Sequence, residues 1–373
     1  MQTTKDVVII GGGVIGCSIA YYLCRSGVAV TLVEKGDIGA EASSAAAGLL
    51  APLGSLSGPG PLADLLLASW SSFPSLVQEL GHASGVHLAY EQNGSLRVAR
   101  NPNSVDNLRK RMNAWQPLGI EMQWLTGDEA RQCEALLAPD ISAAIYAPEE
   151  AQVKAPHVVK AFARAAVNLG VKLHAYHNVI GMDFQKNKIT RVYTDQELEI
   201  ACEHVIVATG AWTRDLERLL DISLPIEPQR GQILALQQPS QPLKHIIFGE
   251  AIYLAPKNDR TIIIGATKEE VGFAKHTTAG GIGWLLSTAV RLLPGLDGAI
   301  IDRMWSGLRP KTPDNLPLLG KAPSLENVTL AVGHGSNGIM LSAITGKSIA
   351  ELVTTGHAPE IIAPFSPGRF AKA

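Results

Sequence analysis

The sequence predicts a mixed α/β fold that combines a parallel βαβ unit with a later region of antiparallel strands. At the start of the chain, the apolar run at 7–10 has the composition of a strand buried on both faces, and a helical pattern begins at Val14, directly after a glycine turn. Residues 28–33 form the second strand of this unit. The pattern over 228–303 changes to antiparallel strands at 231–236, 251–255 and 261–265. Two different sheets are therefore expected in one chain.

The turn after the first strand has the G-x-G-x-x-G spacing of a Rossmann-like dinucleotide site. Gly11 makes the tight turn, Gly13 lets the backbone approach a pyrophosphate, and Gly16 lets the helix pack close to the strand. Glu34 ends the second strand, where a carboxylate suits a ribose diol and disfavours the 2′-phosphate of NADP. The spacing therefore predicts a dinucleotide site, and an ordinary glycine turn is the alternative.

Composition indicates a globular protein long enough for two domains. The chain has 373 residues, of which 46% are hydrophobic and 18% charged, with a net charge of −2. This charge favours neither nucleic acid nor membrane as a partner, and no apolar stretch reaches the roughly 18 residues of a membrane helix. Four cysteines lack metal-ligand spacing, so no metal site is expected: Cys17, Cys24, Cys133 and Cys202. We expect a cytoplasmic protein without stable membrane insertion.

The segment 42–48 contains only small residues. It is either a tightly packed helix start or a stretch of backbone against which a flat group can lie, and its place after the βαβ unit favours the second interpretation. Residues 53–61 form a loop next to it, expected at the entrance of a site. A helix is expected over 62–80, and a strand–turn–strand over 88–99 with Asn93-Gly94 as its turn. Residues 81–145 are expected to form an inserted region without catalytic groups.

Other periodic segments complete the expected fold. Further helices are expected at 105–118, from about 156 to 169, at 284–293 and at 339–353, and further strands at 171–174, 178–181, 188–193, 201–208 and 328–332. The strand 201–208 runs into Thr209-Gly210, a turn that can touch a dinucleotide or simply end the strand. A second glycine-rich turn, 333–338, opens the last helix, so that helix start is expected to face another part of the same ligand.

Several motifs in this order resemble the D-amino-acid oxidase family of FAD-dependent oxidoreductases, most closely the bacterial glycine oxidases of thiamine biosynthesis. The motifs are Gly11-Gly12-Gly13-Val14-Ile15-Gly16, Glu34-Lys35, 43–48, Ala208-Thr209-Gly210-Ala211-Trp212, Trp305-Ser306-Gly307-Leu308-Arg309-Pro310 and Gly333-His334-Gly335. The resemblance implies a discontinuous, Rossmann-like FAD-binding domain and an inserted substrate-binding domain built on a large antiparallel sheet. The expected FAD-binding domain comprises 1–85, 146–227 and 304–373, and the substrate-binding domain comprises 86–145 and 228–303.

The resemblance also implies which residues contact the cofactor and the substrate. The FAD-binding set is Gly11, Gly13, Val14, Ile15, Gly16, Glu34, Lys35, Ala42, Ser43, Ala47, Gly48, Leu49, Val179, Gly210, His334, Gly335, Ser336, Asn337, Gly338, Ile339 and Met340. Arg309 corresponds to the arginine that binds the substrate carboxylate, and Tyr253 to the tyrosine that assists it. The alternatives are an arginine held in a structural ion pair and a strand tyrosine with its hydroxyl at the surface.

The implied reaction is oxidative deamination of a small amino acid or amine. Hydride passes from Cα to flavin N5, the imine is hydrolysed to a 2-oxo acid and ammonia, and oxygen becomes hydrogen peroxide. The implied assembly is a homo-oligomer, a tetramer in related enzymes. Alternatives are a dehydrogenase of D-amino acids or proline with another electron acceptor, a non-catalytic flavin-binding protein, and an NAD enzyme. Ser336 stands where glycine oxidases carry an arginine, which implies a roomier, less cationic pocket that admits sarcosine, larger D-amino acids or proline.

Overall fold

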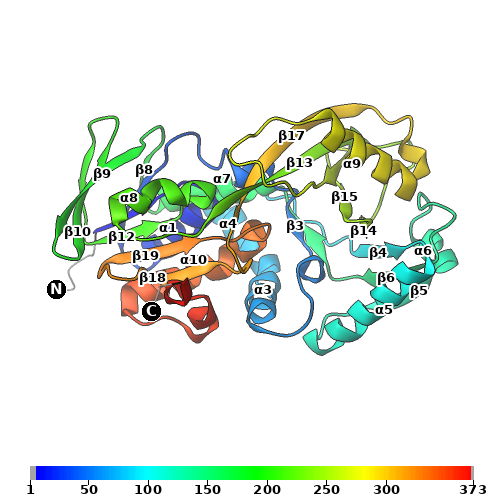
Figure 1. The fold of residues 1–373 in the computed structure, drawn as a ribbon, viewed down its shortest axis with the longest axis horizontal. Coiled ribbons are helices and arrows are strands. Elements are labelled where there is room, and N and C mark those ends of the chain that lie inside the picture. Colours follow the sequence, from blue (N-terminus) through cyan, green and yellow to red (C-terminus); the bar gives the residue numbers. More distant parts are fainter. Residues whose placement is uncertain (1–5, 371–373) are drawn as a thin grey trace.

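The computed structural model describes residues 6–370, and two large sheets dominate it (Figure 1). One sheet has six strands, in the spatial order β18 (Leu318–Lys321), β19 (Val328–Val332), β12 (His204–Val207), β1 (Asp6–Ile10), β2 (Ala29–Val33) and β8 (Lys172–His174). All neighbours in it are parallel except β18 and β19. The predicted βαβ unit therefore supplies two adjacent interior strands, β1 and β2.

Strand β1 lies where the order of this sheet reverses. The chain leaves β1 toward β2 on one side and returns much later to β12 on the other. The carboxyl end of a strand at such a switch point opens into a crevice in doubly wound sheets. Helix α1 (Val14–Arg25) starts at this end and packs between α7 (Ala155–Asn168) and α10 (Gly338–Thr355). The first glycine turn and the last helix are thereby brought together.

The second sheet has eight strands and is largely antiparallel. In spatial order they are β17 (Ile301–Lys311), β13 (Glu227–Gln237), β16 (Thr261–Gly265), β15 (Ile252–Pro256), β14 (Ile246–Gly249), β4 (Ser95–Ala99), β6 (Ala143–Ala147) and β5 (Gln123–Thr126). Alternate residues face opposite sides of a strand. Leu254 accordingly packs toward α9 (Ala279–Leu292), whereas Tyr253 and Ala255 belong to a separate small cluster with Ala47 on the other face. This second face carries the candidate site.

Smaller elements connect and cover the two sheets. A three-stranded sheet contains β11 (Glu199–Ala201), β10 (Lys188–Thr194) and β9 (Val179–Gln185), and β3 (Leu49–Leu50) pairs with β7 (Ala151–Gln152). The other helices are α2 (Ala42–Ala45), α3 (Pro61–Ser71), α4 (Phe73–Ser84), α5 (Pro102–Trp115), α6 (Gly127–Cys133) and α8 (Glu217–Leu220). Short 3₁₀ helices are Pro52–Gly54, Gln116–Leu118, Gly210–Leu216, Pro294–Leu296, Glu360–Phe365 and Pro367–Phe370.

Two local predictions were wrong. The expected single helix over 62–80 is two helices, α3 and α4, because Pro74 offers no N–H to the preceding turn and fits only at a helix start. The expected hairpin at Asn93-Gly94 does not form. Gly94 has a φ of 68°, but the chain before it bridges from Glu91 to Gln152, while β4 is paired on both sides by β6 and β14. No edge of β4 is left for a hairpin partner.

The expected domain limits can be compared with the sheets. Every strand of the six-stranded sheet falls within 1–85, 146–227 or 304–373. Strands β6, β13 and β17 of the eight-stranded sheet each cross an expected limit, near residues 145, 227 and 303. Among residues 6–370, no helix is long and apolar enough to cross a membrane, and no group of His, Cys, Asp and Glu side chains is arranged to hold a metal.

Candidate active site

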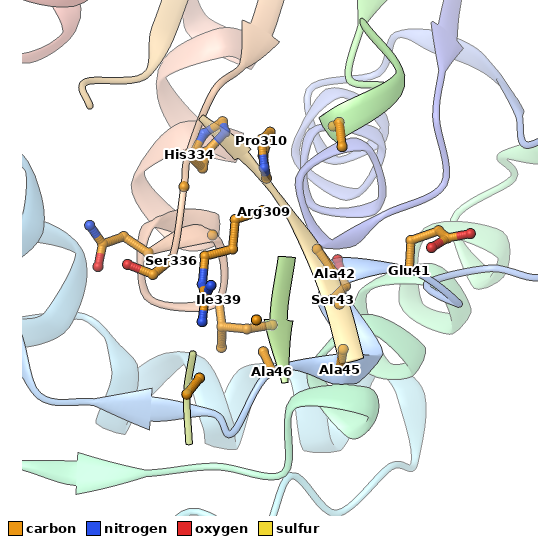
Figure 2. Close-up of a pocket in the computed structure, with 18 of the residues that line it drawn as sticks. Glu41, Ala42, Ser43, Ala45, Ala46, Arg309, Pro310, His334, Ser336 and Ile339 are labelled. Atoms are coloured by element: carbon orange, nitrogen blue, oxygen red, sulfur yellow. The ribbon is translucent and has the colours of Figure 1, made fainter. Parts of the chain in front are cut away.

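A cavity of about 1370 Å³ lies between the carboxyl end of β1 and the face of the eight-stranded sheet that carries Tyr253. It brings together residues from the start, middle and end of the chain. Among the residues predicted for the site, the lining includes Arg309, Tyr253, Gly11, Gly13, Val14, Ile15, Glu34, Lys35, Ala42, Ser43, Ala47, Gly48, Leu49, Val179, Gly210, His334, Gly335, Ser336, Asn337, Gly338, Ile339 and Met340. Gly16 lies outside the lining. Figure 2 shows Arg309 extending between Ser336 and the 42–46 segment.

The glycine turn leaves backbone, rather than side chains, at the start of α1. Gly11 has a φ of 110°, and a Cβ there would lie 2.5 Å from the Ala208 carbonyl oxygen. A Cβ at Gly16 would overlap the Gly11 carbonyl, so Gly16 permits close packing of α1 on the turn. The hydroxyl of Ser43 accepts a hydrogen bond from the Val14 N–H at 3.0 Å. The following amides of the first turn have no acceptor within the helix, which suits an anion.

Glu34 is held in the cavity wall by backbone amides. Its Oε2 accepts a hydrogen bond from the Gly12 N–H at 2.7 Å, and its Oε1 accepts one from the Gly36 N–H at 2.9 Å. These bonds fix the carboxylate and leave acceptor positions on both oxygens for a diol. Beside it, the Lys35 ammonium stacks 4.0 Å from the centre of the Trp212 ring, and burial lowers the pKa of Lys35.

The cavity fits an elongated dinucleotide in its chemistry. A carboxylate, a helix start with free amides and a wall of small residues follow one another along it, from Glu34 past Ser43 to Gly48. Gly48 has a φ of 76°, and a Cβ there would overlap the Val153 carbonyl. Backbone is therefore all that the chain presents at this point of the wall, as the prediction for a flat ligand requires.

Arg309 lines the cavity without an anionic partner. It projects from β17, and its Nη1 donates one hydrogen bond to the Thr267 carbonyl at 3.1 Å. Within residues 6–370 it forms no ion pair. Burial lowers the pKa of the guanidinium, although a group with so high an ordinary value stays charged. The alternative of a structural ion pair is therefore excluded for the described chain.

The nearby carboxylate of Glu269 is already neutralised. It bonds to Arg230 and accepts a hydrogen bond from Gln232 Nε2 at 2.8 Å. Burial acts to raise the pKa of Glu269, but the bonds from Arg230 and Thr267 outweigh it and hold that pKa below its ordinary value. The charge of Arg309 thus remains available to a ligand.

Tyr253 lies on the same face of the sheet as Arg309. Burial raises the pKa of the Tyr253 hydroxyl to about 12, so the group is a neutral hydrogen-bond donor in any physiological buffer. The alternative of a surface hydroxyl does not describe this side chain. Arg309 acts in the opposite direction on the pKa of Tyr253, which indicates how near the two groups are.

Two glycines beneath these side chains were missed by sequence reasoning. A Cβ at Gly231 on β13 would overlap the Arg309 guanidinium, and one at Gly265 on β16 would overlap the Tyr253 hydroxyl. Each polar group therefore lies directly over a neighbouring strand at a point without a side chain. Glycine inside a strand often marks close approach of another group, and this signal was available in the sequence.

The second glycine-rich turn closes the cavity opposite this sheet. His334 is buried, its Nε2 lies 3.2 Å from the Thr345 Oγ1, and burial lowers its pKa to about 3. It is therefore a neutral structural group rather than a base. Ser336 is exposed at the rim, and the Ser55 hydroxyl donates to Asn337 Oδ1 at 2.7 Å. Ser55 lies in the loop expected at the entrance and also lines the cavity.

Comparisons with known proteins agree with this geometry. A family model described as FAD dependent oxidoreductase (DAO) matches residues 6–352. Glycine oxidase of Geobacillus kaustophilus is 35% identical over 368 residues, covering 98% of this chain and 97% of that protein. A crystal structure of glycine oxidase from the same organism has a TM-score of 0.93 at 34% identity, covering 99% of this chain and 100% of the other.

A longer protein is similar over part of its length. The bifunctional protein ThiO/ThiG of Trichormus variabilis is 37% identical over 373 residues, covering 99% of this chain and 56% of that protein. The chain thus spans about half of that relative. The family match covers most of this chain, and it includes both the glycine turn and Arg309. FAD is accordingly the cofactor, and the chain belongs to the DAO family of FAD-dependent oxidoreductases.

Proposed function

We propose that the protein oxidatively deaminates a small amino acid or amine, such as glycine, sarcosine or a small D-amino acid. The observation that carries this proposal is the unpaired Arg309 guanidinium, which reaches into the cavity beside the neutral Tyr253 hydroxyl. A guanidinium fork matches a carboxylate in geometry and charge, and charge-assisted bonds of this kind are roughly twice as strong as neutral ones.

In the proposed mechanism the protein binds and orients, and it supplies no base. Arg309 holds the substrate carboxylate in two hydrogen bonds, and Tyr253 adds a third from its hydroxyl. Two anchored oxygens fix the direction of the Cα–H bond. Holding the reacting groups in a near-attack geometry of this kind can remove a large share of the activation barrier. When bound, FAD supplies the hydride acceptor at N5 and the electrons that turn oxygen into hydrogen peroxide. Water then hydrolyses the imine to a 2-oxo acid and ammonia, or to a 2-oxo acid and methylamine when sarcosine is the substrate.

We also propose positions for the cofactor. Glu34 would bind the ribose diol, the amides at the start of α1 with Ser43 would bind the pyrophosphate, and 47–49 with 334–340 would border the ring. Support comes from the shared cavity and from the free acceptor and donor positions described above. The expected FAD-binding domain is supported by the six-stranded sheet, whose strands all fall within its ranges; β17, which carries Arg309, belongs to the other sheet, so the substrate-binding unit is proposed to include 301–311.

Ser336 supports a wider substrate range than glycine alone. The residue is small, uncharged and exposed at the rim, so a substituent on the amine or on Cα meets neither bulk nor positive charge there. Likeness to glycine oxidases and to a ThiO/ThiG protein supports a role in thiamine biosynthesis. That the protein is a cytoplasmic homo-oligomer is proposed from the family resemblance alone.

An anaerobic panel tests the proposed reaction. The FAD-loaded protein is mixed under nitrogen with glycine, sarcosine, D- and L-proline, and D- and L-alanine, and the flavin absorbance is followed. We expect bleaching by at least one of these amines. Persistence of the oxidised spectrum with all of them would refute the proposal and favour a non-catalytic flavin-binding protein.

Admission of air to the bleached enzyme tests the electron acceptor. We expect the yellow colour to return with one hydrogen peroxide per amine consumed. Slow return without peroxide, together with rapid turnover on a quinone analogue, would favour the dehydrogenase alternative.

A further inference from the structure

Lys257 is a buried ammonium without a carboxylate partner within ion-pair distance among residues 6–370. It follows β15, the strand that carries Tyr253. Its Nζ donates to the Ala47 carbonyl at 2.6 Å, to Gln152 Oε1 at 2.6 Å, and to the Val153 carbonyl at 3.4 Å. All three of its N–H donors therefore have oxygen acceptors, but its charge is not neutralised in contact.

The residues that line the cavity show where Lys257 lies relative to it. Ala47, Gly48 and Leu49 line the cavity, whereas Gln152 and Lys257 do not. The segment 47–49 thus forms a wall one peptide thick, with the ammonium directly behind it. Gly48 is held in this arrangement because its carbonyl accepts a hydrogen bond from the Val153 N–H at 2.8 Å.

The peptide between Ala47 and Gly48 transmits the electrostatic effect of the Lys257 ammonium toward the ligand. In a trans peptide the C=O and the N–H point in opposite directions. Because Lys257 lies behind the wall and binds the Ala47 carbonyl, the Gly48 N–H points to the cavity side. A cation at the carbonyl polarises the peptide and strengthens the N–H as a donor. The cavity side of the wall is therefore both a positioned donor and a region of positive potential.

We propose that Lys257 is a positioning residue for the flavin, which fixes the Ala47–Gly48 peptide against the ring and, by its charge, raises the flavin reduction potential. Reduction adds negative charge to the ring at neutral pH, so a cation behind the wall stabilises the reduced form more than the oxidised form. A unit charge acting over about 8–10 Å at an effective dielectric constant near 20 changes the equilibrium constant for reduction by about 15- to 30-fold. This inference rests on FAD binding and on the proposed position of the ring beside 47–49, and it does not depend on which amine is the substrate.

The proposal implies a pH-dependent potential. Burial lowers the pKa of Lys257 to about 7; the carboxylates of Glu91 and Asp259 oppose this shift, and the ammonium of Lys154 adds to it. Below about pH 7 the charge is present and the potential is high. As pH rises, the charge is lost from the oxidised enzyme first, because by linkage the reduced flavin raises the pKa of Lys257. The potential therefore falls with an additional slope that starts near pH 7.

The test measures the flavin potential of the FAD-loaded protein by dye equilibration with dithionite, from pH 5.5 to 9. The variants are Lys257→Met, which removes both charge and hydrogen bonds, and Lys257→Gln, which keeps a donor. We expect both to have a lower potential below pH 7, by the equivalent of about 15- to 30-fold in the reduction equilibrium, and to lack the additional slope. Wild-type potential and slope in either variant, with FAD bound, would overturn the proposal.

Lys154→Met is the matched control. This lysine pairs with Asp259 at 3.4 Å and is more exposed than Lys257. Its removal is expected to leave the potential at low pH unchanged and to move the slope to higher pH, since its charge helps to lower the pKa of Lys257. If neither Lys257 variant retains FAD, the comparison of Lys154→Met with the wild type tests the proposal instead. A wild-type profile without the additional slope, or a slope that Lys154→Met does not move, would then contradict the proposal.

Discussion

At the scale of single residues, Arg309 is a charge that the fold buries without supplying its counter-charge. The nearest candidate, Glu269, is committed to Arg230 and Gln232. Leaving a buried cation unpaired costs free energy, and proteins retain such groups where a ligand completes them. The same reasoning applies to Lys257, whose charge is expected to be completed by the reduced flavin.

Arg309→Ala is expected to lower kcat/KM for the amino acid by about a hundred- to ten-thousandfold, because two charge-assisted hydrogen bonds of about 1.5–3 kcal/mol each are lost. FAD content is expected to stay at the wild-type level, since Arg309 belongs to the eight-stranded sheet. Steady-state kinetics and the flavin-to-protein absorbance ratio give both quantities. Arg309→Lys keeps the charge without the fork, and its kcat/KM should lie between those of the wild type and of Arg309→Ala. Turnover near wild type in Arg309→Ala would rule out the assigned role.

At the scale of elements, the eight-stranded sheet makes room for the side chains proposed to bind the substrate by placing glycines on the neighbouring strands. Gly231 and Gly265 leave room for the guanidinium and for the phenol on adjacent strands. A side chain at either point would push the functional group off its position without touching the cofactor turn.

Gly231→Ala is expected to reduce kcat/KM by about ten- to a hundredfold, through an overlap that costs roughly 1–3 kcal/mol, while the flavin spectrum remains that of the wild type. Gly283→Ala on α9 is the control, because a Cβ there meets nothing within 4 Å. The two variants are compared in the same kinetic assay. Equal kinetics in both would show that the guanidinium does not depend on the gap.

The turn before α10 makes the fold sensitive to acid. The pKa of His334 is about 3 in the folded protein against 6.5 as its ordinary value, so between these pH values the unfolded chain binds more protons. Stability is therefore present above pH 6.5 and is lost as pH falls, by about 1.4 kcal/mol per pH unit from this group.

Denaturant unfolding at pH 7 and pH 5 measures this effect. We expect the decrease in the free energy of unfolding from pH 7 to pH 5 to be about 2 kcal/mol smaller in His334→Gln than in the wild type. The exposed His357→Gln is expected to behave like the wild type. A decrease that is the same in all three proteins would disprove the assignment to His334.

At the scale of the whole molecule, the six-stranded sheet is expected to hold the cofactor and the eight-stranded sheet the substrate. Glu34→Gln is expected to raise the dissociation constant for FAD by about ten- to a hundredfold, because charge-assisted bonds become neutral ones. With FAD in excess, its KM for the amine should stay close to wild type. Asp37→Asn, an exposed neighbour outside the cavity, is the control. Unchanged FAD affinity in Glu34→Gln would contradict the ribose assignment.

Features set by residues close together in the sequence could be predicted, whereas features set by contacts between distant residues could not. The βαβ unit and Glu34 lie within a contiguous stretch, where strand composition, glycine spacing and helix periodicity agree. The failed hairpin at Asn93-Gly94 and the split of 62–80 depend on which partner is available to β4 and on one proline. Lys257 had no sequence signal, because its environment is made by Ala47 and Val153, which are distant in the chain.

The position of α1 between α7 and α10 has a consequence for synthesis on the ribosome. The nucleotide-binding turn emerges first, but the apolar side of α1 that faces α10 has no cover until residues 338–355 have been made. Until then the growing polypeptide exposes apolar surface of the kind that chaperones recognise. FAD therefore meets a complete binding cleft only after residues 338–355 have been synthesised and have packed against α1.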